Sequence, residues 1–301
     1  MTSALPASLL WIPEDTVKTL LGYYDYPHPE KPGEIIAGYD KHHALRTAKM
    51  CAAVAHYLEH DVERVKHYQI ACVLHDLGRA GLDHDLFGKI WTWAKTNNIP
   101  TRPAEWRAEH PETAYGEETE AFWELYQSDL QALGITTNDW AKEQVEMRLG
   151  YSRRLERMVE IVKPKLEKIN IEWQDWMGTV TLYYYYPEKL SEEPNWIHEL
   201  GEILVACEQL EAYSNRERGS DYYNRNDESF AEAFDYLDGL KEKGQLGLKV
   251  LNAVRHLTST GSFDAILEEA RDRKLSETDI SFLRSLETKN KYRRRGSRHW
   301  R

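Results

Sequence analysis

A histidine–aspartate pair, His75-Asp76, follows an apolar run from Ile70 to Leu74, and Gly78 comes directly afterwards. An imidazole and a carboxylate at the end of a buried helix are costly to desolvate unless a partner compensates them. A divalent metal ion is one such partner, because it accepts both ligand types and neutralises the negative charge. The alternative is a core histidine bonded only to its neighbour. The pair alone does not decide between these two interpretations.

His43 could supply a second nitrogen. Apolar residues recur at helical spacing from Asp40 to Glu59, which predicts an amphipathic helix. Because residues three or four apart share a face, His43 is predicted to face the core together with Thr47 and Met50. His42 is predicted to face water, in one row with Arg46, Lys49, His56 and His60.

Glu208 could supply a second carboxylate. It lies in a segment, Trp196 to Tyr213, whose apolar spacing predicts a helix, and it is in line with Ile197, Gly201 and Leu204. A carboxylate on that apolar stripe needs a cationic partner, a proton or a metal. An ordinary buried salt bridge to an arginine is the alternative.

The composition limits the classes of protein to which this chain can belong. The chain has 301 residues and a formal net charge of −11, which argues against broad nucleic-acid binding. No apolar stretch is long enough to span a membrane, and Met1 to Trp11 lacks the basic region of a signal peptide. The three cysteines, Cys51, Cys72 and Cys207, are a sparse, odd set that indicates reduced thiols. We therefore expect a cytoplasmic protein, and the sequence leaves a homodimer open.

Helical periodicity dominates the chain. Prolines make residues 1–40 irregular apart from a short helix from Glu14 to Leu21. Only Thr179 to Tyr186, with four consecutive tyrosines before Pro187, is predicted to be a strand or extended chain. Elsewhere we expect helices over residues 62–76, 83–94, 103–108, 113–133, 137–168, 196–213, 228–243, 246–257, 263–274 and from 276 onward. The predicted fold is therefore all-α.

In these motifs the chain resembles the HD-domain metallophosphohydrolase superfamily. That family binds metal through a histidine at a helix start, a later His-Asp doublet and a distant acid. The segment His43–Thr47 is similar to the first motif, and His75–Arg79 is similar to the doublet, with Arg79 where many members have lysine. Glu208 stands in the place of the acid.

More specifically, the chain resembles a divergent, degenerate HD-GYP-type domain. Residues 75–82, His110-Pro111 and residues 203–214 carry this resemblance, although the branch has aspartate where this chain has Glu208. The paired histidines and the Gly-Tyr-Pro loop of the branch are absent. Tyr39 stands where some members have a carboxylate, with Asp40 nearby. A cyclic di-GMP phosphodiesterase of the usual type is therefore not expected.

The resemblance also implies a domain organisation. Residues 41–215 would form an HD-domain helical bundle, with residues 112–176 inserted as a helical hairpin. Residues 1–40 would pack on the core, and residues 216–288 would form a C-terminal helical extension. Residues 289–301 are a basic tail that could contact a polyanion, with a solvated end as the alternative.

The function that the resemblance implies is a metal-dependent phosphohydrolase or phosphodiesterase acting on a nucleotide or another phosphate ester. The ligands would be His43, His75, Asp76 and Glu208, with His110 as a further ligand, for one or two ions of Mn, Fe, Ni, Co or Zn. The metal would lower the pKa of a bound water, and Asp76 would help to take its proton. His110 would bind a second metal or protonate the leaving group. Arg79 would hold a phosphate oxygen, with a surface charge as the alternative.

Two other functions stay open. The missing histidines and the exchange at Glu208 also fit a catalytically degenerate HD domain that binds a nucleotide or a protein. A di-iron oxygenase on the same fold would need two irons, with His110 and His84 recruited as ligands.

Overall fold

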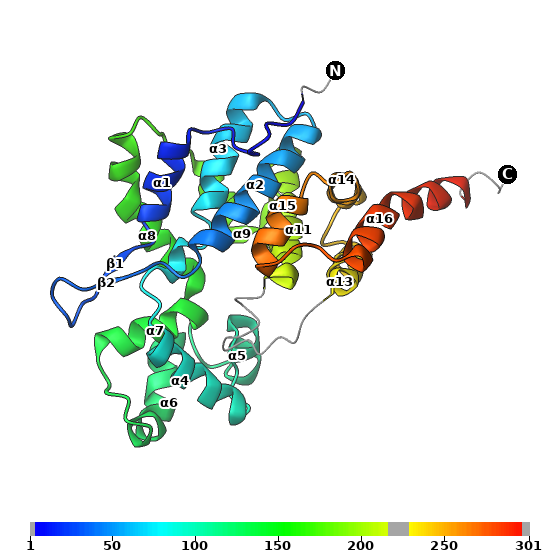
Figure 1. The fold of residues 1–301 in the computed structure, drawn as a ribbon. Coiled ribbons are helices and arrows are strands. Elements are labelled where there is room, and N and C mark those ends of the chain that lie inside the picture. The colour runs from blue at the N-terminus through cyan, green and yellow to red at the C-terminus, as the bar shows by residue number, and fades with distance from the viewer. Residues whose placement is uncertain (1–3, 216–228, 297–301) are drawn as a thin grey trace. The chain divides into compact units, whose positions relative to one another are not determined.

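The computed structural model describes residues 4–215 and 229–296, and this part of the chain is helical almost throughout (Figure 1). The strands described are one short antiparallel pair, β1 (Tyr26–Pro27) and β2 (Ile35–Ile36). The predicted all-α fold is confirmed.

The chain divides into two compact units, which we describe separately. The first unit comprises Met1–Val17, His42–Val73 and Gln174–Arg301. The second comprises Lys18–Lys41 and Leu74–Trp173. Helix α1 (Glu14–Gly22) spans the boundary at Val17. The domain organisation expected from the sequence stays a prediction.

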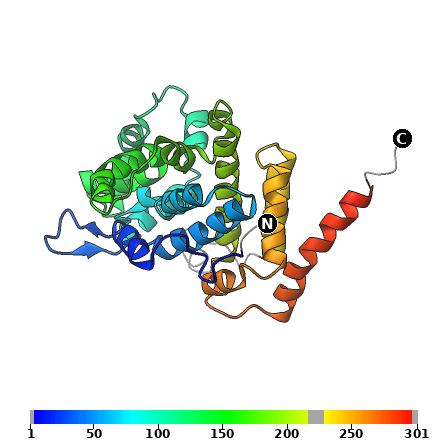
Figure 2. The ribbon, with the colours of Figure 1, turned by 90° about the horizontal axis from the view of Figure 1, so that it is seen from above.

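In the first unit the long helix α11 contacts α9, α10, α13, α14 and α15, while α3 packs on α9 and α14 packs on α16. Figure 2 shows the red α16 beginning beside the gold helices α13 and α14 and then running on beyond them. The helices described in this unit are α2 (Lys41–Tyr57), α3 (Val62–Val73), α9 (Asp175–Tyr183), α10 (Pro187–Leu190), α11 (Asn195–Ser214), α13 (Phe230–Glu242), α14 (Leu248–Ser259), α15 (Asp264–Arg271) and α16 (Glu277–Gly296).

Small side chains explain how α2 fits into the first unit. Ala44, Ala48, Ala52 and Ala55 of this helix are all fully buried. Alanine has the highest intrinsic helix propensity and loses no side-chain entropy on burial, so these positions favour the helix.

The three cysteines are buried in the first unit, one each on α2, α3 and α11, and all are free thiols. Burial raises the pKa of the Cys72 thiol and of the Cys207 thiol well above the ordinary value. Desolvation disfavours the thiolate, so these cysteines are held in their neutral form.

The second unit is built from the β1–β2 pair, a short 3₁₀ turn and five helices. The 3₁₀ turn η1 packs against α8, α4 packs on α7, and α7 also contacts α5, α6 and α8. The elements are η1 (Leu77–Arg79), α4 (His84–Thr96), α5 (Pro103–Glu109), α6 (Glu118–Ala132), α7 (Asp139–Leu149) and α8 (Tyr151–Glu167).

A buried arginine fixes the turn that follows the His75-Asp76 doublet. The Arg154 guanidinium donates from Nη1 to the Gly78 carbonyl and from Nη2 to the Ala80 carbonyl, the latter at 2.8 Å. Its Nε donates to Glu143 at 2.7 Å, and the side chain is almost fully buried. One cation therefore satisfies two carbonyls of the turn and holds it against α8.

The sequence-based expectation of a strand over residues 179–186 is wrong. Residues 175–183 form α9, and the buried residues Met177, Val180, Thr181 and Tyr184 recur at helical spacing. The Thr181 hydroxyl donates to the Met177 carbonyl at 3.0 Å, which is a helical contact. Packing of one face has overridden the strand propensity of the tyrosines.

The helix expected over residues 137–168 is two helices, α7 and α8, separated at Gly150. A Cβ at Gly150 would lie 2.0 Å from the Glu146 carboxylate, so a larger residue there would displace that side chain. Pro164 lies inside α8. The predicted helix over 62–76 also ends earlier, at Val73, which leaves the doublet in the turn after α3.

Gly78→Ala should destabilise the fold, because a Cβ there would lie 2.8 Å from Tyr151 Cε2 and 3.2 Å from Leu155 Cβ. We expect the free energy of unfolding to fall by about 1–3 kcal/mol, as is usual for overpacking. Gly88→Ala is the matched control, because nothing lies within 4 Å of its Cβ position inside α4. That change should raise the free energy of unfolding by roughly 0.5–1 kcal/mol. Urea unfolding followed by circular dichroism measures both, and equal effects would contradict the packing described.

Candidate metal site

The His75-Asp76 doublet is buried in the turn between α3 and η1, at 0% and 2% exposure. The Tyr151 hydroxyl lies 2.7 Å from the His75 carbonyl and 3.0 Å from Asp76 Oδ1. The second oxygen, Asp76 Oδ2, lies 3.8 Å from His75 Nε2. That distance is too long for a hydrogen bond, so the two groups do not simply bond to each other.

Arg79 lies across two buried acids. Its Nη1 is 3.3 Å from Asp40 Oδ2 and 3.6 Å from Asp76 Oδ2, and its guanidinium lies over the Tyr151 ring at 5.6 Å. Asp40 is only 2% exposed. The Arg79 guanidinium therefore forms an ion pair with the doublet, which disfavours the interpretation of Arg79 as an ordinary surface charge.

Two buried tyrosines beside this acidic pair stay protonated. Burial, followed by the charge of Asp76, raises the pKa of Tyr24 and of Tyr151 well above the ordinary value. Both hydroxyls therefore remain hydrogen-bond donors over the whole physiological range.

His43 lies at the start of α2 and is 2% exposed, as predicted from its helical face. Its Nδ1 makes a short hydrogen bond to Glu211 Oε2 on α11. Arg46 Nε donates to the other oxygen of the same carboxylate at 2.7 Å. His43 is therefore held by an acid that is itself held by a cation.

His43 of the first unit and the His75-Asp76 doublet of the second unit are all buried. They offer a group of ligand atoms, two nitrogens and one carboxylate oxygen, that transition-metal dications accept. Residues of these types could hold a metal ion.

Glu208 is not a member of that group of ligand atoms. It is buried, as its position on the apolar stripe predicted, at 7% exposure. Its Oε2 accepts hydrogen bonds from the Tyr185 hydroxyl and from Gln209 Nε2. Glu208 as a metal ligand stays a prediction.

His110 ends the short helix α5 and is also outside the group. Its ring stacks on Trp106 with centroids 4.2 Å apart, and its Nδ1 lies 3.6 Å from Glu112. His84, the other histidine considered for a second ion, packs edge-on against Tyr39 at 4.5 Å. The roles expected for both residues stay predictions.

The prediction for the opposite face of α2 holds only for His42, which is exposed. Arg46, His56 and His60 were expected to face water and are instead buried, at 2%, 8% and 8%. At 3.6 residues per turn Arg46 and His56 both lie within about 40° of His42 around α2, so drift of the row does not explain their burial. Instead α2 is buried on nearly every side, and His60 lies beyond its end at Tyr57.

Sequence reasoning missed Glu211 and Arg46. Each follows a predicted site residue by three positions, Glu211 after Glu208 and Arg46 after His43, which on a helix means neighbouring positions of one face. That spacing was the available signal. The spacing alone does not show which of the two acids, Glu208 or Glu211, contacts His43.

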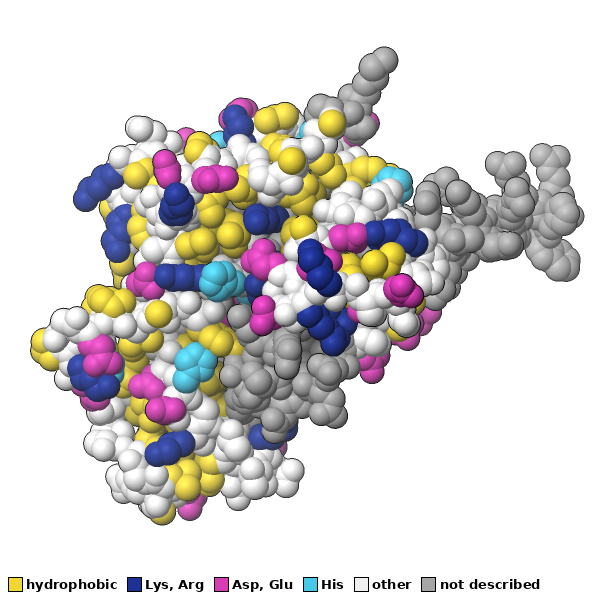
Figure 3. All heavy atoms as spheres, in the orientation of Figure 1, with side chains coloured by type: hydrophobic (Ala, Val, Ile, Leu, Met, Phe, Trp, Pro, Cys, Tyr) yellow, Lys and Arg dark blue, Asp and Glu magenta, His cyan; other side chains and the backbone are white. Residues whose placement is uncertain are grey.

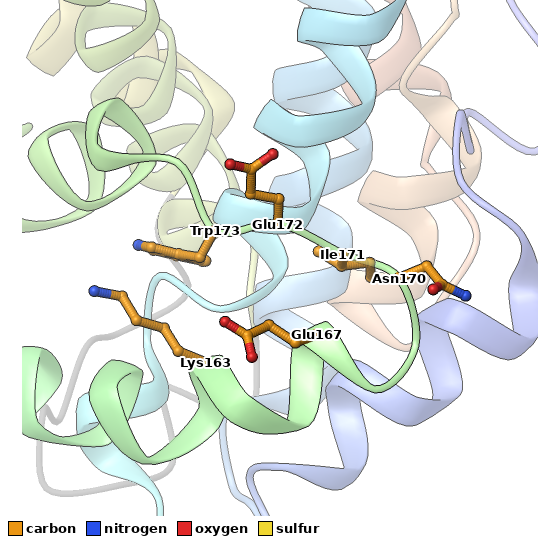
Figure 4. A pocket seen from close by; sticks show the side chains of 6 residues that line it. All are labelled: Lys163, Glu167, Asn170, Ile171, Glu172 and Trp173. Atoms are coloured by element: carbon orange, nitrogen blue, oxygen red, sulfur yellow. The ribbon is translucent and has the colours of Figure 1, made fainter.

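One open pocket of about 460 Å³ lies elsewhere, at the end of α8 and the loop that follows. Figure 4 shows Lys163 and Glu167 projecting from α8 on one side and the indole of Trp173 on the other. None of the predicted site residues lines it. It therefore adds nothing to the metal cluster.

The surface shows no large field of one charge on the face in Figure 3, where acidic and basic side chains are intermixed. In the described residues, no helix has both the length and the apolar composition needed to cross a membrane. Helix α16 continues to Gly296 and so includes the start of the basic tail, while residues 297–301 lie outside the described residues.

The chain was compared with protein-family models, with curated proteins and with solved structures, and none of these comparisons finds a match. The site must therefore be judged on its own residues.

Tyr151→Phe should destabilise the turn that carries the doublet. The change removes the donor to the His75 carbonyl and to Asp76 Oδ1. Loss of a buried hydrogen-bond partner costs about 1–3 kcal/mol. Tyr115→Phe is the control, because Tyr115 is 69% exposed. Urea unfolding should separate the two variants, and equal stabilities would show that the Tyr151 hydroxyl supports nothing.

Proposed function

We propose that this protein is a metal-dependent phosphohydrolase, a divergent HD-domain member that acts on a nucleotide or another phosphate ester. The single observation that carries the proposal is the buried His75-Asp76 doublet, whose Nε2 and Oδ2 atoms lie 3.8 Å apart. The order of these residues along the chain, a histidine and then a His-Asp doublet, is the order of the family that the sequence resembles.

The spacing of the donor atoms fits a shared ion. Two atoms bound to one transition-metal ion at about 2.1 Å each lie roughly 3–4 Å apart. The 3.8 Å between His75 Nε2 and Asp76 Oδ2 falls in that range. It exceeds a hydrogen bond, so a bound cation explains the arrangement better than a direct contact does.

A metal ion held by His43, His75 and Asp76 would supply Lewis-acid polarisation of a phosphoryl oxygen and would lower the pKa of water. The protein's own residues supply the rest. Asp76 is oriented through Oδ1 by Tyr151, and Arg79 adds a positive fork of donors beside it. A guanidinium so placed can hold a phosphate oxygen of the substrate. His110 is proposed as the general acid for the leaving group.

Metal content of the purified protein tests the site directly. His43→Ala, His75→Ala and Asp76→Ala should each abolish metal retention, because each removes one of the proposed ligands. His42→Ala is the matched control, because this neighbouring histidine is exposed. Elemental analysis gives the amount and the identity of the metal. Equal loss in the His42 variant would contradict the assigned helix face.

Hydrolysis of nucleotides and phosphodiesters should depend on the same residues. Metal removal by a chelator should abolish hydrolysis, and added Mn²⁺, Fe²⁺, Ni²⁺, Co²⁺ or Zn²⁺ should restore it in the wild type but not in Asp76→Ala. A protein that holds the metal but hydrolyses none of the substrates would point to the degenerate binding module instead. Two irons per chain would point to the oxygenase.

A further inference from the structure

The Glu211 carboxylate forms hydrogen bonds with three side chains, one of which is the proposed metal ligand His43. It is fully buried on α11. His43 Nδ1 bonds to its Oε2, Arg46 Nε donates to its Oε1 at 2.7 Å, and Asn215 Nδ2 donates to Oε1 at 3.3 Å. All four residues belong to the first unit, so the contacts are internal to one compact body.

This geometry determines the tautomer of His43. A carboxylate accepts hydrogen bonds, so the Nδ1 that faces Glu211 must carry the proton. In a neutral imidazole the lone pair is then on Nε2, which is the atom that can bind a metal. Histidines that ligate metals characteristically donate their other N–H to a carboxylate or a carbonyl in this way.

We propose that Glu211 is a positioning residue that fixes the ring and the tautomer of His43 so that Nε2 is presented to the metal. The proposal rests on the metal site of the proposed function. Arg46 completes the arrangement, because its guanidinium compensates the buried charge of Glu211 and keeps the carboxylate in place. Arg46 also lies 3.5 Å from Glu269 on α15, so the positioning reaches a third helix.

The same helix provides an internal comparison. Glu199, earlier on α11, accepts from His60 Nε2 at 2.9 Å and lies 2.5 Å from Lys249 Nζ. This is again an acid between a histidine and a cation, but His60 is not in the group of ligand atoms. A purely structural role would give Glu199 and Glu211 similar behaviour in a metal titration.

The test compares Glu211→Gln with Glu199→Gln, using metal-free protein titrated calorimetrically with Zn²⁺ or Mn²⁺ alone. Loss of such a supporting carboxylate weakens metal binding by about 10- to 100-fold, and we expect this for Glu211→Gln only. Nitrogen-15 spectra of the histidine rings in the metal-free protein give a second readout. His43 should change from the Nδ1–H tautomer to a mixture in Glu211→Gln and stay unchanged in Glu199→Gln.

The outcomes separate the two proposals. If His43→Ala and His75→Ala bind metal as well as the wild type does, the metal site itself is wrong. If those variants lose the metal while Glu211→Gln and Glu199→Gln bind it equally and His43 keeps its tautomer, only the positioning role is overturned. Should Glu211→Gln not fold, Glu211→Asp and Glu199→Asp replace the pair. Glu211→Asp should bind metal at least roughly threefold more weakly than Glu199→Asp, because the shorter side chain withdraws the carboxylate from His43 Nδ1. Equal affinities overturn the proposal.

Discussion

Charge that is buried away from water must be compensated, and around the candidate site this requirement joins segments that are far apart in the chain. Removing an ion from water costs several kcal/mol, and losing one partner of a buried pair is more costly than losing a surface contact. Glu211 is compensated by Arg46, which brings α11 and α2 together, and Arg79 lies between Asp40 and Asp76. Apolar packing tolerates small shifts, whereas these charged contacts require particular atoms to meet. Within each unit, they therefore fix the position of the side chains that could do chemistry.

The strongest periodic signals in the sequence predicted most of the fold. The helix around His43, the helix leading to the doublet and the long helix at Trp196–Tyr213 all form close to their expected bounds. The buried face of His43 was also correct. These predictions succeeded because helical spacing of apolar residues and local turn chemistry depend on neighbours in the chain. A turn residue such as Gly134, which has a φ of 76°, can likewise be recognised from the sequence.

The errors arose where tertiary contacts decide. Tyrosines near residue 183 have strand propensity, but the packed face of α9 made them helical. The chain breaks between α7 and α8 at Gly150, where an added side chain would displace the Glu146 carboxylate. The choice of Glu211 as the partner of His43 depends on the rotation of α11 against α2. A single sequence fixes the spacing of candidate residues on one helix but not the rotation of two helices against each other.

The burial of all three cysteines has a practical consequence. Attack on an electrophile requires the thiolate and an open path, and Cys51, Cys72 and Cys207 are fully buried, with the pKa of Cys72 and Cys207 raised by that burial. The three thiols of the folded protein should therefore not react with maleimide or iodoacetamide reagents. A single cysteine added at an exposed position such as Leu248 would then be the sole site of labelling among the described residues. Fluorophores or spin labels could be attached there without first removing the native thiols, whose replacement would disturb the packing of α2, α3 and α11.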